Sequence, residues 1–327
     1  MYYIWREESQ VAQTSWIADL AVRGIKRCPE ARRHGMRKRW MCLGLIIWAL
    51  VLPSQVHGNG SGTTAASFLK IPVGARAAAM GEAFSAVVDD ATSLYWNPAG
   101  LVQVKDKEFS AVYNQWFAEI YQGYLGAALS TWRGTVALGV NYVNMGKMEG
   151  RDEWGEPSGE FSASDLQVSL GYGNQISPRL DVGLAVGLIE SKIADDSEST
   201  YSGNLGILFS LSESVSLALV GQNIGSSLGN DSLPFALRGG AAVKSDSLIL
   251  AADLASPSDG PVYYCAGFEW WLGKTLAFRA GYRSERSIGS GITAGLGFQK
   301  GRVRLDYAYV PYDELGTAQR ISLHLRF

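Results

Sequence analysis

The stretch that decides the fold is Ile321-Ser322-Leu323-His324-Leu325-Arg326-Phe327, in which apolar and polar side chains alternate to the last residue. Because successive side chains of a strand point to opposite faces, this alternation predicts a strand with one apolar and one polar face. A large aromatic at the terminus is unusual for a soluble sheet, since chain ends fray, but it is common in the closing strand of a bacterial outer-membrane barrel. There the apolar face contacts lipid and the polar face lines the lumen.

Residues 36–58 have the pattern of a secretory signal peptide. A basic segment, Arg37-Lys38-Arg39, precedes an apolar stretch over residues 40–52, and small residues follow near Gly58. This apolar stretch is too short for a transmembrane helix. We therefore expect Met36 to be the true start and residues 1–35 to be upstream sequence translated from a misassigned start. The alternative is a real cytoplasmic extension with a membrane anchor.

The composition beyond residue 58 restricts the chemistry. It contains 20 Lys and Arg against 27 Asp and Glu, a net charge of −7, which argues against a nucleic-acid partner. Cys265 is the single cysteine and His324 the single histidine, so neither a disulfide nor the usual Ser/His, Cys/His or multi-histidine metal sites are expected. We expect no catalytic residues, no metal, no cofactor and no enzymatic activity. No apolar run reaches ~18 residues, so any membrane crossing must use strands.

Residues 109–327 repeat stretches of about ten alternating residues, the length of a tilted transmembrane strand. The predicted strands are residues 109–117, 122–132, 135–145, 162–174, 179–191, 200–211, 214–224, 234–244, 247–255, 261–271, 275–283, 290–299, 302–311 and 319–327. This number, fourteen, is even, as a single-chain bacterial barrel requires. Short and long connections alternate, which distinguishes the periplasmic from the external end. The longest, residues 146–161, is acidic and is interpreted either as a solvated loop or as a site for a divalent ion or a partner.

A soluble sandwich would show the same period with its apolar face inward. Two observations favour the membrane: the secretion signal, and aromatic residues near the strand ends, where interfacial girdles lie. These are Trp132, Tyr142, Trp270, Trp271, Tyr282 and Tyr309. The predicted fold is therefore an all-β, 14-stranded antiparallel transmembrane barrel in the bacterial outer membrane, surrounded by lipid.

Residues 59–108 predict a linker and a small plug with one short helix. A Gly/Ser/Thr linker covers residues 59–64, residues 68–71 read as extended, and residues 74–84 are mostly small. Asp90 is the expected N-cap of a helix over residues 91–96, which Asn97-Pro98 would end. Such a short helix needs a cover, which the mouth of a barrel would provide.

The sequence Phe68-Leu69-Lys70-Ile71-Pro72-Val73-Gly74-Ala75-Arg76-Ala77-Ala78-Ala79-Met80-Gly81-Glu82-Ala83-Phe84, followed by residues 89–101, Asp-Asp-Ala-Thr-Ser-Leu-Tyr-Trp-Asn-Pro-Ala-Gly-Leu, resembles the PorV/PorQ family. Its wider relatives are the FadL-type outer-membrane transporters. In those proteins the segment with Asn-Pro-Ala is an N-terminal hatch inside the barrel, so the resemblance implies a hatch at Asn97, Pro98 and Ala99. From the residues alone, a helix stop followed by a turn explains the same motif.

Inward-facing charges form a second group of candidate residues. A two-residue turn at Ser245-Asp246 would place Arg238 opposite Asp253, and Glu269 is expected diagonal to Arg279. Arg304 and Asp306 add two more inward charges. This cluster is interpreted either as paired structural charges or as a site for a polar ligand head or the hatch.

The resemblance implies two functions that the sequence does not separate. A PorV-like protein assists type IX-like protein secretion, and its partners are secretion-machinery proteins or secreted cargo bound through the outer loops. A FadL-like channel carries a hydrophobic small molecule such as a fatty acid or an aromatic compound. The channel would use an apolar pocket at the hatch, with Phe84, Leu94, Tyr95 and Trp96 as candidates. A barrel of the same fold with neither role is the third possibility, because fold does not settle function.

Overall fold

The computed structural model describes residues 62–285 and 289–327. The predicted extension over residues 1–35 and the predicted signal peptide over residues 36–58 lie outside the described residues. Among those described, no helix has the length and the hydropathy to cross a membrane.

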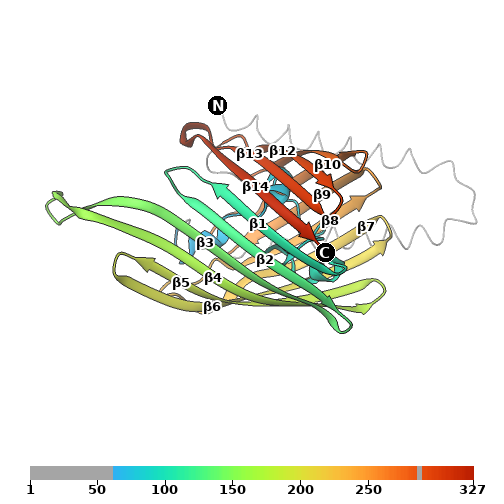
Figure 1. Cartoon of the computed structure of the whole chain (residues 1–327). Helices are drawn as coiled ribbons and strands as arrows, with labels where there is room; N and C mark the ends of the chain where they lie inside the picture. The colour runs from blue at the N-terminus through green and yellow to red at the C-terminus, as the bar shows by residue number, and fades with distance from the viewer. Residues whose placement is uncertain (1–61, 286–288) are drawn as a thin grey trace, which may run out of the picture. The chain divides into compact units, whose positions relative to one another are not determined.

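Fourteen antiparallel strands form one closed barrel (Figure 1). They are β1 (Lys107–Gln115), β2 (Tyr121–Thr131), β3 (Gly134–Arg151), β4 (Pro157–Ser177), β5 (Leu180–Ile193), β6 (Asp196–Ser212), β7 (Val215–Gly225), β8 (Ala236–Lys244), β9 (Leu248–Pro257), β10 (Tyr263–Leu272), β11 (Leu276–Arg283), β12 (Ile292–Lys300), β13 (Val303–Pro311) and β14 (Thr317–Arg326). The barrel closes where β14 pairs with β1, with Leu325 opposite Phe109. Each strand overlaps its predicted range, so the predicted fold class is confirmed.

The two faces of the strands are arranged as the alternation predicts. On β14, Ser322 and His324 are buried in the lumen, whereas Ile321 is 48% exposed on the outer face. On β5, Val186 and Leu188 are 55% and 69% exposed, whereas Ala185, directly before Val186, is buried. A continuous belt of exposed Leu, Val and Ile suits contact with lipid and would be unusual in a protein surrounded by water.

Trp271 corrects one part of the predicted aromatic girdle. Trp132, Trp270 and Tyr309 are exposed on the outside of the barrel, as expected. The Trp271 indole instead turns toward the lumen, where its Nε1 donates to Glu269 Oε1 at 2.9 Å. The reason is the period of the strand itself, because neighbouring residues on β10 must face opposite ways.

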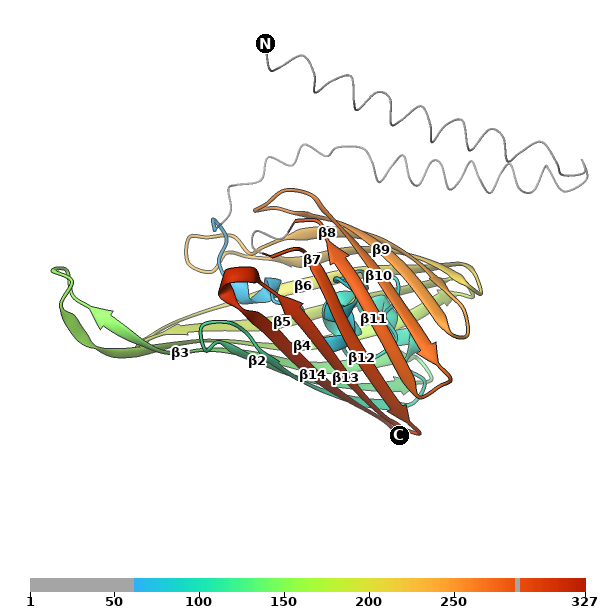
Figure 2. The ribbon, with the colours of Figure 1, turned by 90° about the horizontal axis from the view of Figure 1, so that it is seen from above.

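The two ends of the barrel differ in their connections. One end carries turns of two or three residues, whereas most connections at the other end are longer, so it is the loop end. Two loops predicted as long are largely strand. β3 and β4 continue pairing to Arg151↔Pro157, and their hairpin projects well past its neighbours (Figure 2). β5 and β6 pair as far as Ile193↔Asp196.

The chain before β1 forms a hatch, defined here as residues 62–106, that lies inside the barrel (Figure 2). Its elements are η2 (Ser67–Lys70), α3 (Ala75–Ala79), α4 (Ser93–Trp96) and η3 (Pro98–Gln103). Two local predictions were wrong. Residues 68–71 are mostly a 3-10 turn, not an extended segment, and α4 begins at Ser93. Thr92 holds the N-cap position of α4, so Asp90 lies two residues before it, where its Oδ1 accepts from Thr92 N and Oγ1.

Candidate functional site

Glycines on the inner faces of the strands let the hatch backbone pass close to the wall. A Cβ at Gly281 on β11 would overlap the backbone of Met80 and Gly81, and one at Gly183 on β5 would overlap that of Pro98. Any larger residue at these two positions would therefore displace the hatch. The inward positions that the sequence fills with glycine are where the hatch is seated, so the lumen is built around it.

Asn97 fixes the centre of the hatch and is completely buried. Its Nδ2 donates to Ser85 O at 2.9 Å and to Ile207 O on β6 at 3.3 Å, and its Oδ1 accepts from Ala99 N at 3.1 Å. Pro98 follows as the first residue of η3, where a missing N–H has no cost. The Asn-Pro-Ala motif thus ends α4, starts η3 and ties both to the barrel wall.

The predicted ligand residues of the hatch pack mainly against one another. The Trp96 ring meets Phe84 edge to face at 6.0 Å and Tyr95 at 5.1 Å between centroids. Both polar aromatic atoms are used within the hatch: Trp96 Nε1 donates to Val73 O at 2.8 Å, and Tyr95 OH donates to Leu69 O at 2.9 Å. These contacts make the aromatic side chains a core for the hatch.

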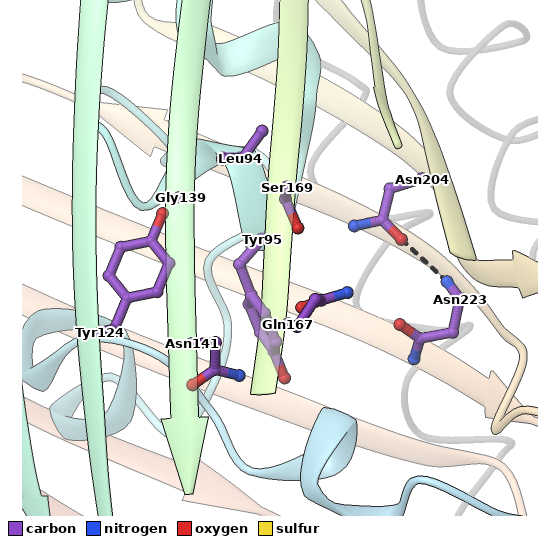
Figure 3. Close-up of a pocket in the computed structure, with 9 residues that line it drawn as sticks. All are labelled: Leu94, Tyr95, Tyr124, Gly139, Asn141, Gln167, Ser169, Asn204 and Asn223. Atoms are coloured by element: carbon purple, nitrogen blue, oxygen red, sulfur yellow. Dashed lines mark hydrogen bonds between the residues drawn. The ribbon is translucent and has the colours of Figure 1, made fainter. Parts of the chain in front are cut away.

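A small cavity of about 10 Å³ lies beside Leu94 and Tyr95, against β2, β3, β4, β6 and β7 (Figure 3). Its other walls are mostly polar: Tyr124, Gly139, Asn141, Gln167, Ser169, Asn204 and Asn223. A space of this size holds about one water molecule. Asn204 Oδ1 accepts from Asn223 N at 2.8 Å, where the β6–β7 register shifts.

Arg76 joins the hatch to β10 through buried ion pairs. Its Nε and Nη2 donate to the two carboxylate oxygens of Glu269 at 2.7 and 2.8 Å, and its Nη1 reaches Asp89 at 2.6 Å. Glu269 also accepts from Arg279 Nε at 2.6 Å. The prediction that Glu269 and Arg279 lie diagonally was wrong, because the two residues are direct partners in the β10–β11 ladder.

The same network continues to β13 and back into the hatch. Arg279 Nη1 lies 2.8 Å from Asp306 Oδ1, and Arg304 Nε lies 3.0 Å from Asp306 Oδ2. Arg304 Nη2 then reaches Asp90 of the hatch at 2.5 Å. Charges this deeply buried are tolerated only when paired, so the network holds hatch and wall in one arrangement.

Arg238 and Asp253 form a separate set. Their predicted ion pair is present, with Nη1 and Oδ2 3.3 Å apart. The register behind it was wrong, because Lys244 pairs with Ile249 and not with Ser247, so Asp253 faces Gly240 instead. Asp253 also accepts from Ser85 N, and Arg238 donates to Glu82 O at 3.0 Å, so this pair too holds the hatch.

A latch at the loop end attaches the start of the hatch to the β9–β10 connection. Asp259 accepts from Lys70 Nζ at 2.7 Å and from Thr64 Oγ1 at 2.6 Å. Burial alone would raise the pKa of Asp259, but the hydrogen bonds from Lys70 and Thr64 outweigh it and lower the pKa below its usual value.

Asp90, Glu108 and His324 bring three possible metal-ligand atoms within 4.8 Å of one another. Arginine already pairs with both carboxylates, since Arg304 contacts Asp90 and Arg326 Nε lies 3.0 Å from Glu108. His324 Nδ1 lies 2.7 Å from Ser110 Oγ. A metal ion would therefore have to displace two arginine partners, and the group fits a structural ion-pair network better.

Four residues of these ion pairs were not predicted from the sequence: Arg76, Glu82 and Asp90 of the hatch, and Arg283 of the wall. Arg283 Nη1 donates to both carboxylate oxygens of Glu82 at 2.8 Å. One signal was available, because Arg76 and Glu82 are charged residues within a run of small residues. A charge in a segment that must be buried implies an opposite charge nearby.

Comparisons with known proteins agree on this architecture. Residues 55–214 match the family model described as "Type IX secretion system protein PorV". No curated protein sequence matches the chain. Among solved structures, similar chains are the "CymD monoaromatic hydrocarbon channel" (TM-score 0.61, 15% identity, 79% of this chain and 98% of that one) and the "Pseudomonas putida toluene transporter TodX" (0.58, 14%, 77% and 96%). A Pseudomonas aeruginosa FadL homologue is also similar (0.53, 9%, 83% and 100%).

At these identities the solved structures establish the fold and no more, whereas the family match covers the hatch and the first six strands. The closed barrel shares its fold with these solved structures. Over residues 55–214 the chain matches the PorV family, and its barrel shares its fold with outer-membrane channels.

Proposed function

We propose that this barrel acts at its outer face, where it assists type IX-like protein secretion by binding secreted cargo or the secretion machinery. The family match over residues 55–214 supports this role, because the family is described as a component of the type IX secretion system. On this proposal, the barrel presents its loops to a protein partner and nothing needs to cross the lumen.

The observation that carries the proposal is the occupied lumen. Buried ion pairs hold the hatch at both Arg76 and Asp90, and strand glycines fit closely around its backbone. Beside Leu94 and Tyr95, the cavity of about 10 Å³ is far below the roughly 300 Å³ at which small-molecule pockets begin. A fixed hatch favours a function that uses the barrel as a platform.

The test combines copurification with a deletion. A tagged chain extracted from outer membranes is expected to bring down secretion components or proteins that carry the C-terminal secretion signal. Deletion of the gene is expected to leave those proteins in the periplasm. Unchanged secretion in the deletion strain would contradict the proposal.

A channel for hydrophobic small molecules is the second candidate. The observation in its favour is the fold shared with the structures titled CymD hydrocarbon channel and TodX toluene transporter. The expected ligand position is beside Leu94 and Tyr95, after the hatch has moved. Uptake of radiolabelled toluene or oleate into vesicles with the purified barrel tests this function. Uptake that Leu94→Trp abolishes would support the channel, and vesicles no more permeable than empty ones would exclude it.

A further inference from the structure

A pocket of about 300 Å³ opens at the loop end of the barrel, between the hatch and the β1–β2, β11–β12 and β13–β14 connections. In Figure 2 the β13–β14 connection, which contains η4 (Asp313–Leu315), lies beside the first turn of the hatch. We call this space the mouth pocket, and its apolar wall consists of Ile71, Pro72, Trp116, Phe117, Tyr312 and Leu315.

Three aromatic rings of the mouth pocket pack into one preformed group. Tyr312 lies 5.5 Å from Trp116 and 5.4 Å from Phe117 between ring centroids, and Trp116 lies 5.2 Å from Phe117. The buried Arg320 guanidinium lies 5.5 Å from the centroid of the Trp116 ring. A wall that is already packed loses little conformational freedom when a ligand binds, which favours affinity.

The connections that present these rings contain strained backbone. Ala118 and Glu119 follow Phe117 with φ of 52° and 60°, and Asp313 follows Tyr312 with φ of 45°. A non-glycine residue in this left-handed region is strained and persists only where the surroundings impose it. Three of the seven described non-glycine residues with positive φ therefore lie in the two segments that carry these rings.

The charge of the loop end is strongly one-sided. The described loop-end segments are residues 116–120, 145–162, 190–199, 226–235, 258–262, 284–285, 289–291 and 312–316. They hold fifteen Asp and Glu but three Lys and Arg. The six short turns at the opposite end hold four Lys and Arg and two Asp and Glu. A ring of one sign raises the local concentration of oppositely charged partners and speeds their association.

Within residues 62–285 and 289–327, the two cations that line the mouth pocket, Lys70 and Arg283, are each paired with a carboxylate. Lys70 is paired with Asp259 at 2.7 Å, and Arg283 is paired with Glu82 at 2.8 Å. The acidic side chains of the connections around the pocket, Glu119, Asp313 and Glu314, are exposed. An anionic ligand such as a fatty acid would meet repulsion here, whereas a basic one would be attracted.

We propose that the mouth pocket binds an apolar or aromatic side chain from a basic, extended segment of a partner protein. The aromatic wall contacts this side chain, and the Asp and Glu residues of the loop-end segments pair with the Lys and Arg residues that flank it. Buried aromatic anchors commonly dominate binding energy, and surrounding charges add selectivity and rate. This inference rests on the proposed secretion role and names the chemistry of the partner segment.

The test measures peptide binding to the purified full barrel in lipid nanodiscs by fluorescence anisotropy. The probe is a fluorescein-labelled Lys/Thr/Val peptide with one central Phe. Two matched peptides replace either Phe by Ala or every Lys by Glu. The Phe/Lys peptide is expected to bind at least tenfold more tightly than both, and its affinity is expected to fall as salt rises. Equal affinities for the three peptides would overturn the proposal.

Variants then locate the site. Trp116→Ala and Tyr312→Ala should each weaken peptide binding at least fivefold. The double change Asp313→Asn with Glu314→Gln touches only exposed side chains and should reduce the salt dependence without affecting the fold. Trp132→Ala, an exposed aromatic at the opposite end, is the matched control and should bind as the parent does. Loss of binding in the control but not in the pocket variants would refute the site.

Two further outcomes separate the inference from the function on which it rests. If the barrel bound Ca²⁺ but no peptide at low salt, the acidic loop-end residues would be a cation site, and the inference would be overturned. Normal secretion by the Trp116→Ala and Tyr312→Ala strains, beside blocked secretion in the deletion strain, would leave the proposed function standing without this site. Specific peptide binding by a barrel whose deletion leaves secretion unchanged would support the site and refute the function.

Discussion

Glu269 on β10 faces Arg279 on β11 directly across their hairpin, and the Glu269 carboxylate also receives the Arg76 guanidinium of the hatch. One wall carboxylate thus serves two arginines, one from the barrel and one from the hatch. Its side chain and that of Arg279 are fully buried. Removing the charge would leave two arginines without their shared partner, which is far more costly than losing a surface pair.

We expect Glu269→Gln to favour opening of the hatch by about 3–5 kcal/mol. Cys265 reports the opening, because it is 2% exposed and lies in the same buried cluster as Met80 and Phe84. In a chain with Cys28 and Cys42 replaced by serine, a maleimide should label Cys265 much faster in the variant. Glu160→Gln, which breaks an exposed pair with Lys147, is the control. It should change the free energy of hatch opening, derived from the labelling rate, by less than about 1 kcal/mol. Equal labelling of the two variants would show that the Glu269 network does not hold the hatch.

Gly281→Val should displace the hatch while the barrel still assembles. The new side chain would overlap the backbone at Gly81, which no rotamer change can relieve. We expect the unheated and heated proteins to differ in electrophoretic mobility, as a folded barrel does, and we expect Cys265 to react with maleimide. Gly123→Val is the matched control, because no atom lies within 4 Å of its Cβ, and it should leave Cys265 protected. A protected Cys265 in Gly281→Val would mean that the hatch is not seated against β11.

Val186→Arg tests which face of β5 meets lipid. Val186 is 55% exposed, and an arginine near the middle of the bilayer costs about 2–4 kcal/mol. Urea unfolding in lipid vesicles should show a loss of that size. Trp154→Arg at the tip of the β3–β4 hairpin, 79% exposed, should unfold as the parent does. No loss in Val186→Arg would place this face outside the hydrocarbon.

Acid should release the latch at Asp259 before it affects the barrel. The folded state holds the pKa of this carboxyl below its usual value, so its contribution to stability is complete above the usual pKa near 3.8. That contribution is lost as the pH falls through the lowered folded value. Hydrogen exchange of the amides of Ala65, Leu69 and Ile71, corrected for intrinsic rates, should rise over this interval. Asp259→Asn should exchange fast at every pH, and a parent-like profile in that variant would contradict the role of the latch.

The barrel could be predicted from the sequence because the alternation of apolar and polar residues is a local pattern within each strand. Alternation along each strand predicts which face is apolar, and this holds from Leu180 to Phe327. Register was harder, since it depends on the length of each turn. Centring the turn on Ser245-Asp246, one residue too early, shifted the pairing by two positions and moved the partner of Asp253 from Gly240 to Arg238. Even so, the Arg238 side chain is long enough to reach Asp253 diagonally.

The contacts of the hatch could not be derived in the same way. Arg76 and Glu269 are 193 positions apart, and no local pattern connects them. The resemblance predicted that residues 97–99 belong to a hatch, whereas the ion pairs that hold it depend on how far the hatch enters the barrel. The length of the β3–β4 hairpin escaped prediction because its charged residues read as loop, although they pair as far as Arg151.

The pairing of β14 with both β1 and β13 has a consequence for biogenesis. The hatch is translated before every strand, yet Ala75 N donates to Ser322 Oγ on the strand that seals the ring. The plug must accordingly be captured while the sheet is still an open ribbon. A chain that ends just before β14 would leave the edges of β1 and β13 without partners and the hatch exposed. Such a chain would be a substrate for periplasmic quality control.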